Sequence, residues 1–154
     1  LYEDFNITNN DSFLDIGSGL GLMCFLMNKT YNFKNVYGCE INTVTYEVAM
    51  ENKRRLNINN VVFTNKSIVD YEIPDSVNYM YYFNAIDKDY NEDFKLICNK
   101  INESYNKHKR DIIILFMYCH INDTIRNILK EYNFNLVKNG KDKYDYIIVK
   151  VGGS

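Results

Sequence analysis

The chain has 154 residues, of which 46% are hydrophobic and 25% are charged, and its formal net charge is −2. These values are typical of one globular domain, and they exclude a disordered or collagen-like chain. The near balance of charge disfavours a dedicated nucleic-acid binder, and no apolar run approaches the roughly 20 residues of a membrane-spanning helix.

Hydrophobic periodicity predicts short strands that alternate with helices along most of the chain. The expected strands are Ser12–Ile16, Asn35–Cys39, Val61–Thr64, Val77–Phe83 and Asp111–Cys119, and the expected helices are Leu22–Asn28, Thr43–Leu56, Tyr90–Lys107 and Asn122–Tyr132. The last of these strands, DIIILFMYC, is apolar on both faces, as a central parallel strand should be. This alternation is the pattern of βαβ units around a parallel sheet.

The pattern changes after the last helix. Two strand-like runs, Phe134–Lys138 and Tyr144–Val151, are separated by NGKD, and an Asn-Gly pair between apolar runs is typical of a β-hairpin. Five parallel strands and an antiparallel hairpin predict an α/β fold, a Rossmann-like three-layer sandwich with a mostly parallel seven-stranded sheet. We expect one domain over residues 1–151 and exclude the GGS at 152–154 as a candidate appended tail.

A glycine-rich turn, in the stretch FLDIGSGLGL, follows the first expected strand. Its three glycines are Gly17, Gly19 and Gly21. Such a turn lets the backbone approach a ligand closely and aims the free N–H groups of the next helix at it. The dinucleotide fingerprint GxGxxG needs a glycine at position 22, where this chain has Leu22. The sequence therefore disfavours a nicotinamide or flavin enzyme.

The stretch DIGSGLG, from Asp15 to Gly21, resembles motif I of the class I S-adenosylmethionine (SAM) methyltransferases. The resemblance implies that SAM is the cofactor and that the turn holds its methionine end. Asp15 would balance the ammonium group and order the loop. The residues implied in this contact are Asp15, Gly17, Ser18, Gly19 and Gly21.

Glu40 ends the second expected strand, in YGCE. Nucleotide-binding sheets of this type place an acid there, about 20 residues after the glycines, to accept hydrogen bonds from ribose hydroxyls. Ile41 resembles the apolar residue that the family packs against the adenine ring. After the third strand, many family members have an aspartate that accepts from the adenine amino group. Here Lys66 is a donor, so Asn65 and Ser67 are the candidate acceptors.

Asn84 follows the fourth expected strand, where methyltransferases keep residues close to the transferred methyl group. The sequence there, NAID, lacks the two prolines of enzymes that methylate the amino groups of bases. DIGSGLG, YGCE and an asparagine after strand four together look most like the non-SET histone lysine methyltransferases. Asn84 and His120 are the candidate catalytic residues, with a strand cap and a structural histidine as the alternatives. Asp87 and Tyr118 are further candidates for a general base.

Most candidate residues follow an expected strand: Gly17–Gly21, Glu40, Asn65–Ser67, Asn84 and His120. Open α/β sheets bind ligands at the carboxyl ends of their strands. The sequence therefore predicts a SAM-dependent methyltransferase that acts on a protein or small-molecule acceptor. One alternative is an inactive methyltransferase-like subunit that scaffolds a partner, which the missing adenine acid, the absent prolines and the short segment before motif I allow. The other is an RNA methyltransferase, since a nucleic-acid partner is disfavoured but not excluded.

Four cysteines, Cys24, Cys39, Cys98 and Cys119, lie in apolar or helical segments without a CxxC pair. We therefore expect buried free thiols and no metal site. The first residues, LYEDFNITNND, lack the basic and apolar regions of a signal peptide. Both features favour a cytoplasmic or other reducing intracellular compartment. The basic run NKRR at Asn52–Arg55 is interpreted as a solvated helix face, and the oligomeric state is not predicted.

Overall fold

The computed structural model of the chain describes residues 2–83 and 90–153. Within these residues seven strands form one mixed sheet in the order β3-β2-β1-β4-β5-β7-β6. The pairs β1–β2, β2–β3 and β4–β5 are parallel, whereas β7 is antiparallel to both β5 and β6. This order confirms the predicted Rossmann-like α/β fold with its C-terminal antiparallel hairpin.

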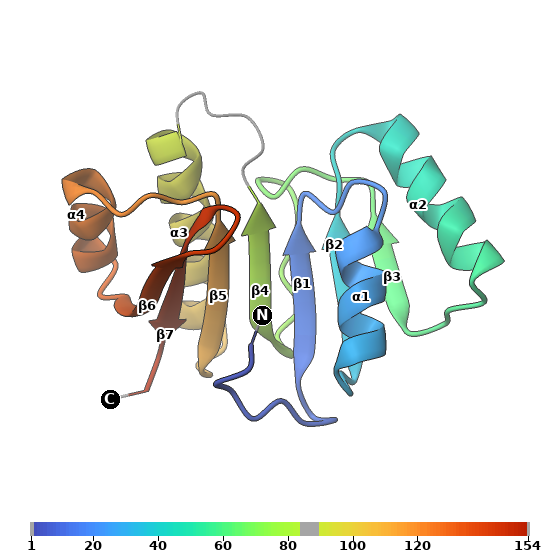
Figure 1. The fold of residues 1–154 in the computed structure, drawn as a ribbon, viewed down its shortest axis with the longest axis horizontal. Coiled ribbons are helices and arrows are strands. Elements are labelled where there is room, and N and C mark those ends of the chain that lie inside the picture. The colour runs from blue at the N-terminus through green and yellow to red at the C-terminus, as the bar shows by residue number, and fades with distance from the viewer. Residues whose placement is uncertain (1, 84–89, 154) are drawn as a thin grey trace. The chain divides into compact units, whose positions relative to one another are not determined.

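The chain forms two compact units, and the first ends at Tyr71. Its elements are β1 (Ser12–Ile16), α1 (Leu22–Thr30), β2 (Asn35–Cys39), α2 (Thr43–Arg55) and β3 (Val61–Thr64). Strand β1 is buried along its whole length, which explains why its sequence is apolar apart from Ser12 and Asp15. Helix α1 packs against all three strands and α2 packs against β3 (Figure 1).

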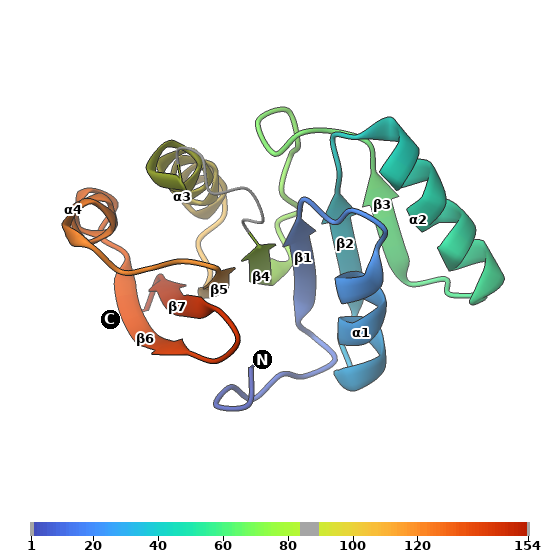
Figure 2. The ribbon, with the colours of Figure 1, turned by 45° about the horizontal axis from the view of Figure 1, so that its top comes forward.

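The second unit begins at Glu72. Its elements are β4 (Val77–Phe83), α3 (Tyr90–Lys107), β5 (Ile112–Met117), α4 (Asp123–Glu131), β6 (Asn135–Lys141) and β7 (Asp145–Val151). Figure 2 shows β7 between β5 and β6. Strand β5 is buried from Ile112 to Phe116, as its apolar sequence predicts. The expectation of a single domain over residues 1–151 stays a prediction.

Asparagines mark both ends of helices α2 and α4. Asn42 and Asn122 cap the two N-termini, where their side chains accept hydrogen bonds from Thr45 N and Ile125 N. Asn57 and Asn133 follow the C-caps with φ angles of 52° and 56°. Asparagine tolerates this left-handed conformation better than most residues, so the helices end there.

The hairpin differs from the prediction in the position of its turn. Strand β6 continues through Asn139 and Gly140 to Lys141, so the Asn-Gly pair is part of the strand and does not form the turn. A Cβ atom on Gly140 would lie 2.7 Å from the Tyr146 hydroxyl oxygen. The glycine therefore makes room for the ring of Tyr146 across the strand pair, which is a long-range cause that a local turn signal does not reveal.

No helix in residues 2–83 and 90–153 is long and apolar enough to span a membrane. In the same residues, no group of three or more His, Cys, Asp or Glu side chains is arranged to hold a metal ion. All four cysteines are free and buried, as expected.

Candidate cofactor site

The turn between β1 and α1 depends on three glycines in the left-handed region of the backbone. The φ angles of Gly17, Gly19 and Gly21 are 77°, 52° and 85°. A Cβ atom on Gly21 would lie 2.6 Å from the Phe63 ring, so this glycine is required for packing. A Cβ atom on Gly17 would meet no atom within 4 Å, and one on Gly19 would meet only a Glu40 oxygen at 4.0 Å. The open side of the turn is therefore a bare backbone surface that a ligand can approach.

Ser18 fastens the turn to the end of β2. The backbone N–H groups of Gly17 and Ser18 both donate to the Cys39 carbonyl oxygen at 2.9 Å. Ser18 is buried, and its hydroxyl oxygen has no hydrogen-bond partner in the described part of the chain. A Cβ atom on Gly38 would lie 2.7 Å from that oxygen, so the glycine of YGCE provides the space for Ser18. Sequence reasoning missed Gly38, because its contact with Ser18 joins β2 to the turn after β1, 20 residues earlier in the chain.

Asp15 lies on β1 with only 4% of its surface exposed. Burial, and secondly the charge of Glu40, raise the pKa of Asp15 from 3.8 to about 7. A buried carboxyl group of this kind is stabilised in its charged form by a nearby cation.

Glu40 links the glycine turn to the start of α2. Its Oε1 atom accepts a hydrogen bond from the Gly19 N–H at 3.0 Å, and Oε2 accepts from the Asn42 N–H at 3.1 Å. Each carboxylate oxygen has about two lone-pair sites, so each can accept one further hydrogen bond. Glu40 is therefore oriented by the backbone and can still accept from two hydroxyl groups.

Asn65, at the end of β3, holds the turn that follows β2. Its Nδ2 atom donates to the carbonyl oxygens of Glu40 and Ile41, at 2.8 and 3.2 Å. Its Oδ1 atom accepts from the Thr43 hydroxyl at 3.0 Å. The side chain is thus engaged mainly in positioning this turn. Ile41 itself is 70% exposed, so its apolar side chain can be covered by a ligand.

Ser67 lies in the loop after β3, where its hydroxyl donates to the Asp70 carboxylate at 3.3 Å. The loop is closed by two backbone hydrogen bonds, because the N–H groups of Asp70 and Tyr71 both donate to the Ser67 carbonyl oxygen. An acid is therefore present in this loop, three residues beyond Ser67. Sequence reasoning missed it because the family places its acid directly after the strand.

Residues 7–152 match the protein family described as "Methyltransferase domain". The chain belongs to this family. The site fits a ligand that carries an ammonium group and ribose hydroxyls. Its relevant features are the bare glycine turn, the buried Ser18 hydroxyl, the buried Asp15 carboxyl group and the oriented Glu40 carboxylate. The chain is a SAM-dependent methyltransferase, and SAM is its methyl donor.

Solved structures show that its fold is widely shared. Magnesium protoporphyrin IX methyltransferase (ChlM) from Synechocystis PCC 6803 with bound SAM is 20% identical, with a TM-score of 0.61 over 90% of this chain and 67% of that chain. A SAM-dependent methyltransferase from Aquifex aeolicus is 12% identical, with a TM-score of 0.71 over 96% of this chain and 85% of that chain. An RNA methyltransferase from Salinibacter ruber in complex with S-adenosyl-L-homocysteine is 12% identical, with a TM-score of 0.70 over 93% and 81% of the respective chains.

Among curated proteins, no sequence matches the chain. The family and structural matches support a class I Rossmann-fold methyltransferase, and they give no support to the resemblance to histone lysine methyltransferases. They do not determine the methyl acceptor.

Of the residues predicted to take part in catalysis, Tyr118 and His120 belong to the second unit. Asn84 and Asp87 lie outside the described residues. The side chain of His120 is 79% exposed, and its Nδ1 atom lies 3.3 Å from Asp145 Oδ2. Tyr118 follows β5 and is partly exposed. The roles of Asn84 and His120 stay predictions.

A cavity of about 400 Å³ lies elsewhere in the second unit. Its lining residues are Tyr105, Tyr132, Asn133, Phe134, Asn135, Val151, Gly152 and Gly153. Val151 pairs with Ile112 at the amino end of β5, so the cavity lies at the opposite end of that strand from Tyr118. It contains none of the predicted site residues.

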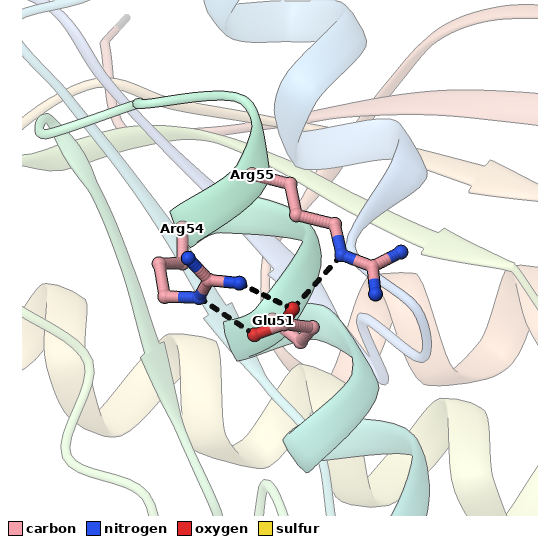
Figure 3. Close-up of polar contacts among 3 residues, drawn as sticks. All are labelled: Glu51, Arg54 and Arg55. Atoms are coloured by element: carbon pink, nitrogen blue, oxygen red, sulfur yellow. Dashed lines mark hydrogen bonds and ion pairs between the residues drawn. The ribbon is translucent and has the colours of Figure 1, made fainter.

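Both arginines of the basic run on α2 pair with one acid of the same helix, Glu51 (Figure 3). Glu51 accepts hydrogen bonds from Arg54 Nε and Nη2 at 2.8 and 2.7 Å, and from Arg55 Nε at 2.8 Å. These hydrogen bonds lower the pKa of Glu51 to about 2. The arrangement agrees with the interpretation of this run as a solvated helix face.

Proposed function

We propose that this methyltransferase transfers the methyl group of SAM to a protein or small-molecule acceptor. The net charge of −2 supports this choice over RNA, since phosphate binding favours a basic surface. The four buried, free cysteines support a reducing intracellular compartment as its location.

The observation that carries the site assignment is the Glu40 carboxylate, held by the amides of Gly19 and Asn42 beside a bare glycine turn. In the proposed site Asp15 pairs with the SAM ammonium group, and the backbone of Gly17–Gly21 contacts the methionine end. Glu40 accepts hydrogen bonds from the ribose hydroxyls. These three assignments place the polar groups of SAM opposite groups of complementary charge.

The adenine end is assigned to residues after β2 and β3. Ile41 covers the ring face, which explains an apolar side chain left 70% exposed. Asn65 positions the Ile41 turn, and the pair of Ser67 and Asp70 provides an acceptor for the adenine amino group. Asp70 thereby replaces the acid that the family places closer to the strand.

SAM supplies an activated methyl group, so the protein mainly has to bind and orient the two reactants. Correct orientation alone can contribute about 7–11 kcal/mol to lowering the barrier. Asn84 and His120 stay the candidate catalytic residues of the proposed reaction. His120, whose Nδ1 atom faces Asp145, can accept a proton from the acceptor at Nε2.

Isothermal titration calorimetry with SAM and S-adenosylhomocysteine tests the site. The wild-type protein should bind both, and no binding at about 1 mM would overturn the assignment. Gly19→Arg should abolish binding because its side chain fills the bare turn. Leu56→Arg, on the exposed end of α2, is the matched control and should bind as the wild type does.

A methyl-transfer assay tests the acceptor. Protein, small-molecule and RNA fractions of a cell extract are incubated with the enzyme and SAM that carries a labelled methyl group. Label in the protein or small-molecule fraction supports the proposal. Label confined to RNA would overturn it, and SAM binding without transfer to any fraction would favour a scaffolding subunit.

A further inference from the structure

Asn52 begins the basic run on α2, and its side chain makes a different contact from those of the two arginines. Arg54 and Arg55 pair with Glu51 on their own helix (Figure 3). The Nδ2 atom of Asn52 instead donates to the Leu20 carbonyl oxygen at 3.3 Å. Asn52 and Leu20 are 32 positions apart in the chain, so this hydrogen bond joins α2 to the glycine turn. Asn52 therefore faces the turn, whereas the arginines face solvent.

The peptide unit between Leu20 and Gly21 is hydrogen-bonded at both of its ends. Its carbonyl oxygen, on Leu20, accepts from the Asn52 side chain. Its N–H group, on Gly21, donates to the Ser18 carbonyl oxygen at 2.9 Å. The second bond closes the turn on itself, and the first comes from another element. The orientation of this peptide unit therefore depends on a side chain of α2.

The local backbone does not fix this orientation by itself. Leu20 lies between Gly19 and Gly21, whose φ angles are 52° and 85°. Glycine adopts positive and negative φ about equally well, so a peptide unit beside a glycine can rotate at little cost. The Leu20 side chain is 43% exposed, so burial anchors this residue weakly. The hydrogen bond from Asn52 therefore supplies a constraint that the turn itself lacks.

Helix α2 is joined to the turn at a second point, near its N-terminus. The Glu40 carboxylate accepts hydrogen bonds from the N–H groups of both Gly19 and Asn42. Asn42 is the N-cap of α2, and Asn52 lies further along the same helix. The helix therefore holds the turn at two successive residues, at Gly19 through Glu40 and at Leu20 through Asn52.

We propose that Asn52 is a positioning residue for SAM, because its hydrogen bond keeps the Leu20–Gly21 peptide unit in the orientation that the methionine end requires. The proposal rests on the proposed function, in which the glycine turn holds this end of SAM. The methionine end carries a carboxylate. A Leu20 carbonyl oxygen released from Asn52 is free to turn towards the open side of the turn, where it would repel that carboxylate. Asn52 makes no contact with SAM in this proposal and acts through the turn.

Asn52→Leu tests this role without adding a charge. Leucine has a similar size and favours a helix, but it has no donor for the Leu20 carbonyl oxygen. The affinity for SAM, measured by calorimetry, should fall about fivefold, which corresponds to the loss of one neutral hydrogen bond. Asn52→Gln keeps an amide donor and should restore the wild-type affinity. Asn28→Leu, half-buried near the end of α1 that is remote from the turn, is the matched control and should bind SAM as the wild type does.

A second ligand separates positioning from a general effect on the fold. 5′-Methylthioadenosine has no methionine carboxylate, so Asn52→Leu should bind it as tightly as the wild type does. The melting temperature of the variant should change little, because substitutions of partly exposed residues usually have small effects on stability. An equal loss of affinity for both ligands would overturn the proposal, and so would an unchanged affinity of Asn52→Leu for SAM.

Amide hydrogen exchange of the ligand-free protein, measured by NMR, separates this proposal from the proposed function. The Gly21 N–H belongs to the peptide unit that Asn52 holds. It should exchange at least about tenfold faster in Asn52→Leu than in the wild type and in Asn28→Leu, because the released unit opens more often. Unchanged exchange would overturn the role of Asn52 in the turn, whether or not the protein binds SAM. Faster exchange in a protein that binds no SAM would support that role and refute the proposed cofactor site instead.

Discussion

The Glu40 carboxylate accepts a hydrogen bond from the backbone amide of Gly19, with 3.0 Å between Oε1 and N. Its other oxygen accepts from the amide of Asn42 at 3.1 Å. One side chain therefore connects the turn after β1 with the first residue before α2. Two backbone amides fix the position of the Glu40 carboxylate. A substitution that keeps the shape of the side chain therefore tests the role of its charge.

Glu40→Gln should weaken SAM binding at least about tenfold, as expected for the loss of a hydrogen bond to a charged group. A glutamine can present its oxygen to only one of the two backbone donors, and its NH₂ group then faces the other. Calorimetry with SAM measures the change. Glu47→Gln, at an exposed position of α2, is the control and should leave the affinity unchanged. Wild-type affinity in Glu40→Gln would contradict the role of this carboxylate.

Asp15 should make the stability of the ligand-free protein depend on pH. Its pKa is about 7 in the folded protein, mainly because it is buried, and near 4 in the unfolded chain. Between these values the folded protein binds more protons, so its stability falls as the pH rises from about 4 to 7 and then levels off. Urea unfolding from pH 5 to 8 measures this slope. Asp15→Asn should reduce the slope, and an identical profile in the variant would refute the buried ionisation.

The same group should make SAM affinity depend on pH in the opposite direction. Only the ionised carboxylate of Asp15 attracts the SAM ammonium group, so the affinity should rise by up to about tenfold per pH unit towards pH 7 and flatten above it. Titrations at pH 5.5, 6.5, 7.5 and 8.5 are the check. Asp15→Asn should bind weakly with little pH dependence in this range. A wild-type affinity that is constant across the four values would contradict the pairing.

Gly38→Ala should destabilise the protein by about 1–3 kcal/mol, the usual cost of overpacking. The added Cβ atom would lie 2.7 Å from both Cβ and Oγ of Ser18 and 2.8 Å from the Phe63 ring. Gly140→Ala is the control, since its new Cβ atom meets the far end of the Tyr146 side chain, which can move. Urea unfolding should show a larger loss for Gly38→Ala. Equal losses would mean that the turn does not depend on space at Gly38.

The succession of strands and helices along the chain was predictable from sequence because the signals that define it are local. Apolar runs predict the strands, and the glycines after β1 and the acid after β2 lie at the ends of those runs. The Asn139-Gly140 pair shows the limit of this reasoning. It has the composition of a tight turn, yet Gly140 is explained by a tyrosine six residues away across the hairpin.

The glycine turn of the candidate site was predictable from the sequence, whereas the contacts that its side chains make were not. Motif I identifies Asp15 and the glycines because the family resemblance covers them. By contrast, the Asn65 side chain donates a hydrogen bond to the Glu40 carbonyl oxygen in the turn after β2. The Ser18 side chain packs against Gly38. Both contacts join residues at least 20 positions apart, and no spacing rule in the sequence connects them. The sequence therefore indicates which residues gather at the site but not which of them position the others.

Asn65→Asp should weaken binding at the nucleoside end of SAM about tenfold. In the wild type, Asn65 Nδ2 donates to the carbonyl oxygens of Glu40 and Ile41. The new carboxylate has no donor there, so its oxygens repel these two carbonyl oxygens and the turn loses its anchor. 5′-Methylthioadenosine, which lacks the amino-acid tail, is the diagnostic ligand. Its affinity should fall in Asn65→Asp and stay unchanged in Asp15→Asn, whereas SAM affinity should fall in both. Asn59→Asp, at an exposed position before β3, is the control. Loss of methylthioadenosine binding in Asp15→Asn would contradict the assignment of Asp15 to the methionine end of SAM.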